Sequence, residues 1–279
     1  MDKTLNCAGK LLDLTKPQIM GVLNVTPDSF SDGGLFMSKE SALFQAQKMF
    51  ADGAAIIDVG GESTRPGATP VSAQEELDRV IPVIESIHKE IPVIISIDTS
   101  KPHVMREAVN AGAGMINDVY ALRQPGAVQT VADLDVPVCL MHMKGEPRTM
   151  QEKPQYENII QDVNEFLAQR IHECERGGIQ RQNIIVDPGF GFGKTVQHNL
   201  ILVKHLPEFF SFDLPLMVGF SRKSTIGAIL NKSSGDRIMG SISLAVIACW
   251  HGAQIFRVHD VKDTADALKL CISVRNVSP

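Results

Sequence analysis

The stretch ADGAAIIDVG, residues 51–60, shows the pattern that decides the fold. A polar helical stretch ends at a glycine, a short apolar run follows, and a polar residue closes the run. Glycine just past a helix supplies a left-handed cap, and a continuous run of Ile and Val is typical of a strand buried on both faces. The stretch therefore predicts the end of a helix followed by a strand of a parallel sheet.

The same pattern returns along the chain. It recurs in NAGAGMINDV (110–119), GGIQRQNIIVDPG (177–189) and HGAQIFRVHD (251–260), and further apolar runs lie at 19–25, 92–97, 136–141 and 214–218. Eight strands with helical stretches between them predict a single (β/α)₈ TIM barrel over residues 1–279, a fold that typically takes about 250 residues. A doubly wound open sheet is the alternative, because a strand count alone does not separate the two folds.

The composition is that of an ordinary soluble protein and narrows the classes of function. The chain has a formal net charge of −5 with dispersed Lys and Arg, which argues against a nucleic-acid partner. The apolar run 242–250 is too short to span a membrane and predicts a buried helix. No secretory signal is visible, and the five cysteines are widely separated. We therefore expect a cytoplasmic protein with free thiols and no membrane partner.

Polar side chains close most of the apolar runs. Residues at the C-terminal ends of barrel strands line the active site, so these side chains should converge there. They are Asn24, Asp58, Asp98, Asn117, His142, Asp187, Arg257 and His259. Asp58 is interpreted as a turn residue, because Gly60 and Gly61 follow it. For His142 and its neighbour Met143, packing and catalysis are equally good interpretations.

A second group of residues suits an anion. GFSRKS, residues 219–224, opens a helix after the seventh strand, where hydroxyl groups, cations and N–H groups bind phosphate. Arg257 and His259 add donors, and the amide oxygen of Asn24 could hold Mg²⁺ beside a diphosphate. The loops NVTPDSFSDGG (24–34) and GESTRPG, which ends at Gly67, have the composition of mobile loops that could close over an anionic substrate.

The segment DPGFGFGKT, residues 187–195, resembles a nucleotide-binding phosphate loop only at first sight. That motif needs G-x-x-x-x-G-K-[ST], and the residue five before Gly193 is Pro188. Lys194 and Thr195 are therefore not expected to bind a nucleotide.

Asp187 instead joins Asp98 and Asn117 at the predicted centre of the barrel. Two carboxylates and an amide suit the donor edge of a flat heterocycle that bears N–H groups. The sequence thus predicts a heterocycle site next to a diphosphate site.

Several motifs, taken together in their order and spacing, resemble the dihydropteroate synthase family: NVTPDSFSDGG, GESTRPG, SIDTSK, INDV, MHM, DPGFGFGKT, GFSRKS and RVHDV. The resemblance implies a transferase of folate biosynthesis. It would join 4-aminobenzoate to 6-hydroxymethyl-7,8-dihydropterin diphosphate and release pyrophosphate. A homodimer and competition by sulfonamides are also implied.

The resemblance assigns the predicted residues to parts of the substrates. The pterin and the chemistry are expected at Asp98, Asn117, Asp187, Lys223 and Arg257. The diphosphate is expected at Arg257 and His259, with Mg²⁺ at Asn24. The aminobenzoate is expected among Phe30, Asp32, Thr64, Arg65, Pro66, Phe192 and Ser224, and Gly219 opens the same substrate-binding segment as Ser224.

An arylamine is a poor nucleophile, so departure of pyrophosphate before attack, an S_N1-like route, is the expected mechanism. Two alternatives stay open. Methyltetrahydrofolate-binding methyltransferases share the pterin carboxylates, although a methyl donor gives no reason for the phosphate-binding residues. A barrel that binds a pterin without turnover is the other alternative.

Overall fold

Eight parallel strands form a closed barrel in this computed structural model, which describes residues 4–26, 39–63, 69–146 and 149–278. The strands are β3 (Gln18–Asn24), β4 (Ile56–Gly60), β5 (Ile94–Asp98), β6 (Met115–Asp118), β7 (Val138–Met141), β8 (Ile184–Asp187), β9 (Met217–Val218) and β10 (Ile255–Val258). They pair in the order β8-β7-β6-β5-β4-β3-β10-β9. A parallel bridge between Val186 and Leu216 joins the two outer strands. The TIM barrel is confirmed, and the doubly wound open sheet is wrong.

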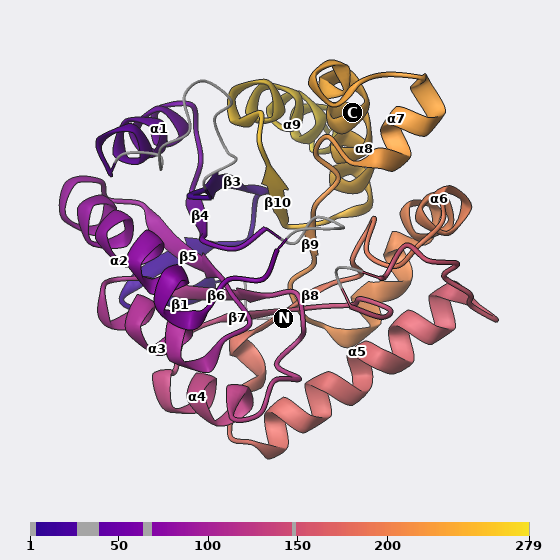
Figure 1. Cartoon of the computed structure of the whole chain (residues 1–279). Coiled ribbons are helices and arrows are strands. Elements are labelled where there is room, and N and C mark those ends of the chain that lie inside the picture. The colour runs from indigo at the N-terminus through magenta and orange to yellow at the C-terminus, as the bar shows by residue number, and fades with distance from the viewer. Residues whose placement is uncertain (1–3, 27–38, 64–68, 147–148, 279) are drawn as a thin grey trace.

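The helices form a ring around the strands in chain order (Figure 1). They are α1 (Lys39–Ala51), α2 (Ala73–Glu90), α3 (Pro102–Asn110), α4 (Ala127–Leu134), α5 (Ile159–Arg176), α6 (Val196–Lys204), α7 (Ser224–Leu230), α8 (Ile238–His251) and α9 (Val261–Arg275). Short 3₁₀ helices η2 (Arg181–Asn183), η3 (Leu206–Phe212) and η4 (Ser234–Asp236) lie in connecting segments. Each crossover helix covers the outer face of the sheet, as parallel strands require.

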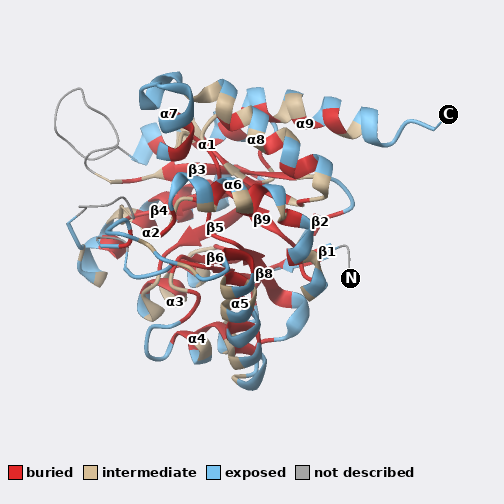
Figure 2. Cartoon of the chain, turned by 90° about the vertical axis from the view of Figure 1, so that its right-hand side faces the viewer, coloured by how far each residue is buried: buried red, intermediate tan, exposed pale blue. Residues whose placement is uncertain are grey.

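The apolar core has two parts. One lies between the strands and the helices, and the other fills the barrel interior with Met20, Ile56, Met115 and Ile185. Figure 2 shows buried residues along the strands and on the inward faces of the helices. Among the described residues, no helix combines the length and the apolar character needed to cross a membrane.

Two features differ from the sequence-based expectation. An antiparallel hairpin, β1 (Thr4–Cys7) and β2 (Lys10–Asp13), precedes the barrel, and its side chains Leu5 and Leu12 join the interior core. The apolar run 242–250 lies in α8, but the prediction that this helix is buried is wrong in part: Ile247 and Trp250 are exposed.

Candidate active site

The register of the strands brings the predicted strand-end residues to one level of the barrel. Asn24 pairs with Gly60, Gly60 with Asp98, and Asp98 with Asn117 on successive strands. A cavity of about 40 Å³ opens at this level. Its lining includes Asp98, Asn117, Asp187, Phe192, Gly219, Ser221, Lys223, Arg257 and His259. Residues predicted from five separate segments of sequence therefore meet in one place.

Arg257 on β10 is held by two carboxylates. Its Nε lies 2.6 Å from Oδ2 of Asp58, and its Nη2 lies 2.6 Å from Oδ2 of Asp98. Burial alone would lower the pKa of the guanidinium, but Asp58 and Asp98 outweigh this effect and raise it. The group is therefore a fixed positive charge at the floor of the cavity.

Asp58 is part of this site, so its interpretation as a turn residue is wrong. It lies inside β4 and is fully buried. Its Oδ2 accepts hydrogen bonds from Arg257 and, at 3.1 Å, from Nδ2 of Asn117. A turn residue would bind nearby backbone, whereas Asp58 fixes two side chains of the predicted site.

Asp98 combines burial with a partner of opposite charge. Burial and the nearby carboxylate of Asp58 raise its pKa to about 7, although Arg257 lowers it. The side chain can therefore change protonation state near neutral pH, which is common for groups at functional sites.

Asp187 and Lys223 line the same cavity. Burial raises the pKa of Asp187, and Lys223 and the amide of Gly189 oppose the shift. Oδ1 of Asp187 accepts from that amide at 2.7 Å. Burial lowers the pKa of Lys223 to about 8, with Asp187 opposing the shift. The Lys223 ammonium lies 4.6 Å from the ring centre of Phe192 and donates to the carbonyl of Phe190.

The anion-binding group predicted at residues 219–224 is only partly assembled. Ser221 lines the cavity, and its Oγ lies 3.0 Å from Nδ1 of His259. Arg222, by contrast, is paired with Asp260 at 2.5 Å. Ser224 is exposed and lines neither described cavity. Of residues 219–224, Ser221 and Lys223 therefore line the cavity, together with Arg257 and His259, whereas Arg222 helps to hold the loop.

Lys194 and Thr195, which follow the glycines, form hydrogen bonds within the protein. Lys194 is buried, with its Nζ 2.8 Å from Nδ1 of His142 and 2.8 Å from the carbonyl of Gly189. Thr195 caps α6, where its side chain accepts from the amide of His198. Met143 is buried in a small apolar cluster with Met141. For His142 and Met143 the structure thus supports packing.

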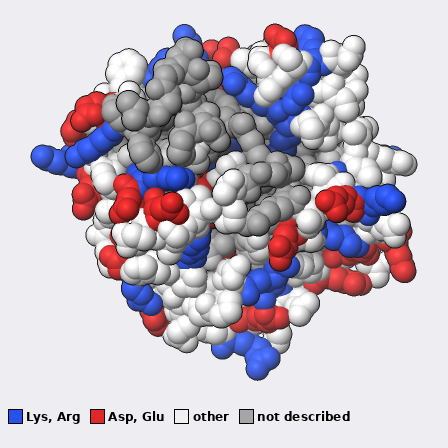
Figure 3. Space-filling model, viewed as in Figure 1, with Lys and Arg blue, Asp and Glu red and all other residues white. Residues whose placement is uncertain are grey.

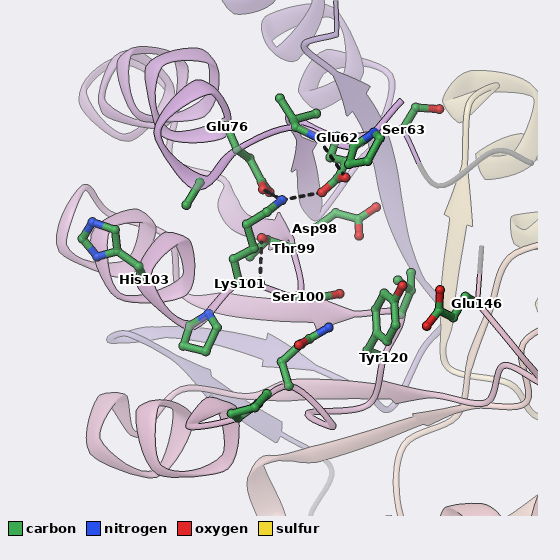
Figure 4. Close-up of a pocket in the computed structure, with 17 residues that line it drawn as sticks. Glu62, Ser63, Glu76, Asp98, Thr99, Ser100, Lys101, His103, Tyr120 and Glu146 are labelled. Carbon is green, nitrogen blue, oxygen red and sulfur yellow. Dashed lines mark hydrogen bonds and ion pairs between the residues drawn. The ribbon is translucent and has the colours of Figure 1, made fainter. Parts of the chain in front are cut away.

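A larger cavity of about 440 Å³ adjoins the site and shares Asp98 and Val119 with it. Figure 4 shows Lys101 between Glu62 and Glu76 in its wall; the Lys101 ammonium lies 2.5 Å from Glu76 Oε2. Most of the predicted residues line the smaller cavity, so we place the chemistry there. In the larger cavity, Lys101 forms ion pairs with Glu62 and Glu76.

Part of the prediction falls outside the described residues. Phe30, Asp32, Thr64, Arg65 and Pro66 belong to residues 27–38 and 64–68. Over the described surface seen in Figure 3, Lys and Arg are interspersed with Asp and Glu.

Comparison with known proteins agrees with the site. The model of the pterin binding enzyme family matches residues 20–259. Dihydropteroate synthase of Haemophilus influenzae is 55% identical over 267 residues, which cover 96% of this chain and 97% of that protein. A Yersinia pestis dihydropteroate synthase solved in a sulfonamide drug complex has a TM-score of 0.95 at 50% identity, and the match covers 98% of this chain and 100% of that one.

A Xanthomonas albilineans dihydropteroate synthase solved with 4-aminobenzoic acid has a TM-score of 0.94 at 47% identity, and the match covers 100% of both chains. The similarity extends over the barrel and over every described segment of the site. The chain belongs to the dihydropteroate synthase family.

Proposed function

We propose that this chain is a transferase that joins 4-aminobenzoate to 6-hydroxymethyl-7,8-dihydropterin diphosphate, giving 7,8-dihydropteroate and pyrophosphate in folate biosynthesis. One observation carries the proposal: Asp98, Asn117 and Asp187 face one cavity together with Lys223, Arg257 and His259. Acceptors for a pterin and cations for a diphosphate are thus only a few ångströms apart. The similar proteins of Haemophilus influenzae and Escherichia coli are dihydropteroate synthases, which agrees with this proposal.

The pterin would lie in the smaller cavity. Carboxylates of Asp98 and Asp187 accept hydrogen bonds from ring N–H groups, and the amide of Asn117 can donate and accept. The guanidinium of Arg257 is planar and rigidly held, so it suits contact with the face of a flat ring. Asp58 would act indirectly, by fixing Arg257 and Asn117.

The bond that breaks joins the pterin methylene to the diphosphate oxygen, which leaves with the electron pair. The amine nitrogen of 4-aminobenzoate then bonds to the methylene and loses one proton. His259, Ser221 and Arg257 would stabilise the charge that develops on the leaving group. Asp98 and Asp187 would favour a cationic pterinylmethyl intermediate, which is why we propose the S_N1-like order of events.

Mg²⁺ is proposed at Asn24, whose amide oxygen faces a space that Gly60 leaves open. A Cβ added at Gly60 would lie 3.6 Å from Oδ1 of Asn24 and 3.8 Å from Oδ2 of Asp98. Within the described residues, no cluster of three or more His, Cys, Asp or Glu could hold a metal. One amide oxygen fits an ion that keeps several waters and binds substrate phosphates. When bound, Mg²⁺ would neutralise charge on the departing pyrophosphate.

The aminobenzoate is proposed beside Phe192 and Lys223, at the outer side of the pterin. The ring of Phe192 offers an apolar face, and the ammonium of Lys223 lies next to it. The Yersinia pestis relative was solved with a sulfonamide drug and the Xanthomonas albilineans relative with 4-aminobenzoic acid. We therefore propose that sulfonamides compete with 4-aminobenzoate here. Phe30, Asp32, Thr64, Arg65, Pro66 and Ser224 stay proposed members of the same subsite on the family resemblance alone.

The assembly and location of the protein are also proposals. The last helices expose apolar side chains, which supports a homodimer that buries them: Ile229, Leu230, Met239, Ile247, Trp250, Leu270 and Val274. All five cysteines are buried and unbridged, which suits the reducing cytoplasm.

Pyrophosphate release tests the function directly. Purified protein is incubated with the dihydropterin diphosphate and Mg²⁺, with and without 4-aminobenzoate, and both pyrophosphate and dihydropteroate are measured. Formation of both products supports the proposal. Tight pterin binding without release would overturn it in favour of a methyltransferase or a binding barrel, and a methyltetrahydrofolate assay then separates those two.

A secondary deuterium isotope effect at the methylene tests the order of the steps. Loss of pyrophosphate before attack changes that carbon towards a planar cation, so a normal effect clearly above unity is expected. An effect close to unity would contradict the S_N1-like route while leaving the overall reaction in place.

A further inference from the structure

The glycine segment, Gly189–Gly193, is held by side chains rather than by regular secondary structure. Its glycines all have positive φ, at 71°, 85° and 63°, so the segment continues neither β8 nor a helix. Each of its five backbone carbonyls nevertheless accepts from a side chain. The donors are Lys194 to Gly189 and Phe192, Lys223 to Phe190, Gln151 to Gly191, and Tyr156 to Gly193.

The buried side chain of Lys194 holds this segment from the interior of the protein. Its Nζ has three close partners: the carbonyl of Gly189 at 2.8 Å, the carbonyl of Phe192 at 3.0 Å and Nδ1 of His142 at 2.8 Å. Burial lowers the pKa of Lys194 well below its usual value, and burial together with Lys194 lowers the pKa of His142 to about 2. The N–H groups of Lys194 donate to the two carbonyls, and the contact with Nδ1 of the neutral His142 ring is a hydrogen bond whichever of the two nitrogens carries the proton.

Tyr156 holds the other side of the segment. Its hydroxyl donates to the carbonyl of Gly193 at 2.7 Å. Its ring packs edge-on against His198 with centroids 4.9 Å apart, and lies 6.0 Å from the ring of His142. Tyr156 is therefore fixed by its own neighbours and can fix Gly193 in turn.

Phe192 is the one side chain of the segment that lines the site cavity. The glycines on either side of it impose little restriction on the backbone. The position of its ring therefore depends on the carbonyls of Phe192 and Gly193, which Lys194 and Tyr156 hold. Neither Lys194 nor Tyr156 lines either described cavity.

We propose that Lys194 and Tyr156 are positioning residues that hold Phe192 in place for the aminobenzoate, an inference that rests on the proposed function. They act through the backbone of the glycine segment and touch no substrate. Loss of either contact should therefore weaken the use of 4-aminobenzoate more than the use of the pterin, whose carboxylates stand on the barrel strands.

The test compares Lys194→Met and Tyr156→Phe with wild type and with Lys204→Met, a control at an exposed lysine of α6. Amide hydrogen exchange of the glycine segment is measured first, without substrates. Its amides at Gly191 and Phe192 are hydrogen-bonded and so report local opening. Lys194→Met, which removes two bonds to the segment, should speed exchange on the order of tenfold, and Tyr156→Phe about threefold.

Steady-state kinetics provides the second measurement. In Lys194→Met the KM for 4-aminobenzoate should rise about tenfold, while the KM for the pterin substrate changes less than about twofold. Unchanged exchange, or an equal rise in both KM values, overturns the inference. If Lys194→Met does not fold, Tyr156→Phe decides by the same two criteria. If wild type itself forms no dihydropteroate, the proposed function fails, and hydrogen exchange still decides whether these residues hold the segment.

Discussion

At the scale of single residues, Asp58 contributes a buried charge that both stabilises the barrel and orients the site. Its Oδ2 pairs with Arg257, while Oδ1 has no hydrogen-bond partner among the described residues. Removing Asp58 leaves Arg257 paired with Asp98, but it takes the acceptor from Nε of Arg257 and from Nδ2 of Asn117. A buried donor left without an acceptor costs about 1–3 kcal/mol. We expect Asp58→Ala to lower the free energy of unfolding by that amount in urea denaturation.

The matched control for this prediction is Asp52→Ala. Asp52 pairs with Lys48 at the surface, where such pairs contribute up to about 1 kcal/mol. Equal losses in the two variants would show that the buried pair between Asp58 and Arg257 is not a major source of stability.

The pH dependence of the reaction should also be set by single residues. Ionised Asp98 accepts pterin N–H groups, and its raised pKa of about 7 means that kcat/KM rises as pH increases through that value. Protonated Lys223 donates, and its lowered pKa of about 8 means that kcat/KM falls above it. Because kcat/KM reports the pKa values of the free enzyme, a narrow bell between the two is expected.

Two variants test which residue sets the acid side and which the alkaline side of this pH profile. Asp98→Asn cannot ionise and should lose the acid limb along with most of the activity. Lys223→Arg keeps a positive charge at high pH and should move the alkaline limb upward. A profile that is flat through this range in wild type would contradict both assignments.

At the scale of elements, the hairpin of β1 and β2 closes the end of the barrel opposite the site. Leu12 is 2% exposed and packs in the interior core, whereas its neighbour Leu11 is 71% exposed. Leu12→Ala should therefore lower the free energy of unfolding by about 2–5 kcal/mol. Leu11→Ala, on the other face of the same strand, should change it by less than about 0.5 kcal/mol.

Enzyme assays complete this comparison. Both variants should keep wild-type KM values, because the catalytic residues stand at the other end of the strands. A raised KM in Leu12→Ala alone would show that the hairpin influences the site. The sequence did not predict this element: each strand has only four residues, and so short an alternation does not stand out from a polar N-terminus.

At the scale of the whole molecule, the exposed apolar side chains of α7, α8 and α9 support the proposed homodimer. Leu270 and Val274 lie one helical turn apart on α9 and are both exposed. Replacing both with Glu should place charges in an apolar interface and convert the dimer to a monomer, as measured by light scattering after size-exclusion chromatography.

A charge placed on the N-terminal hairpin provides the control. Leu11→Glu adds the same chemical change at an equally exposed residue away from these helices, and it should leave the dimer intact. A dimer that persists in the double variant of Leu270 and Val274 would show that α9 is not part of the interface.

The sequence by itself determined the barrel and most of its site. Repeated helix, glycine and apolar-run units are local patterns, and parallel strands bring their carboxyl ends to one edge whatever the intervening loops contain. Asp98, Asn117, Asp187, Arg257 and His259 were predicted for that reason, and the structure places them together.

Only the tertiary structure decided how the charges pair. Asp58 finds Arg257 across 199 positions of sequence, Arg222 turns to Asp260, and Lys194 turns inward to the glycine segment. Such choices depend on which partner lies within hydrogen-bond distance after the strands close, and on the cost of burying a charge without one. Spacing along the chain does not contain those distances, so the same lysine that resembles a phosphate ligand in sequence is a buried support in the folded protein.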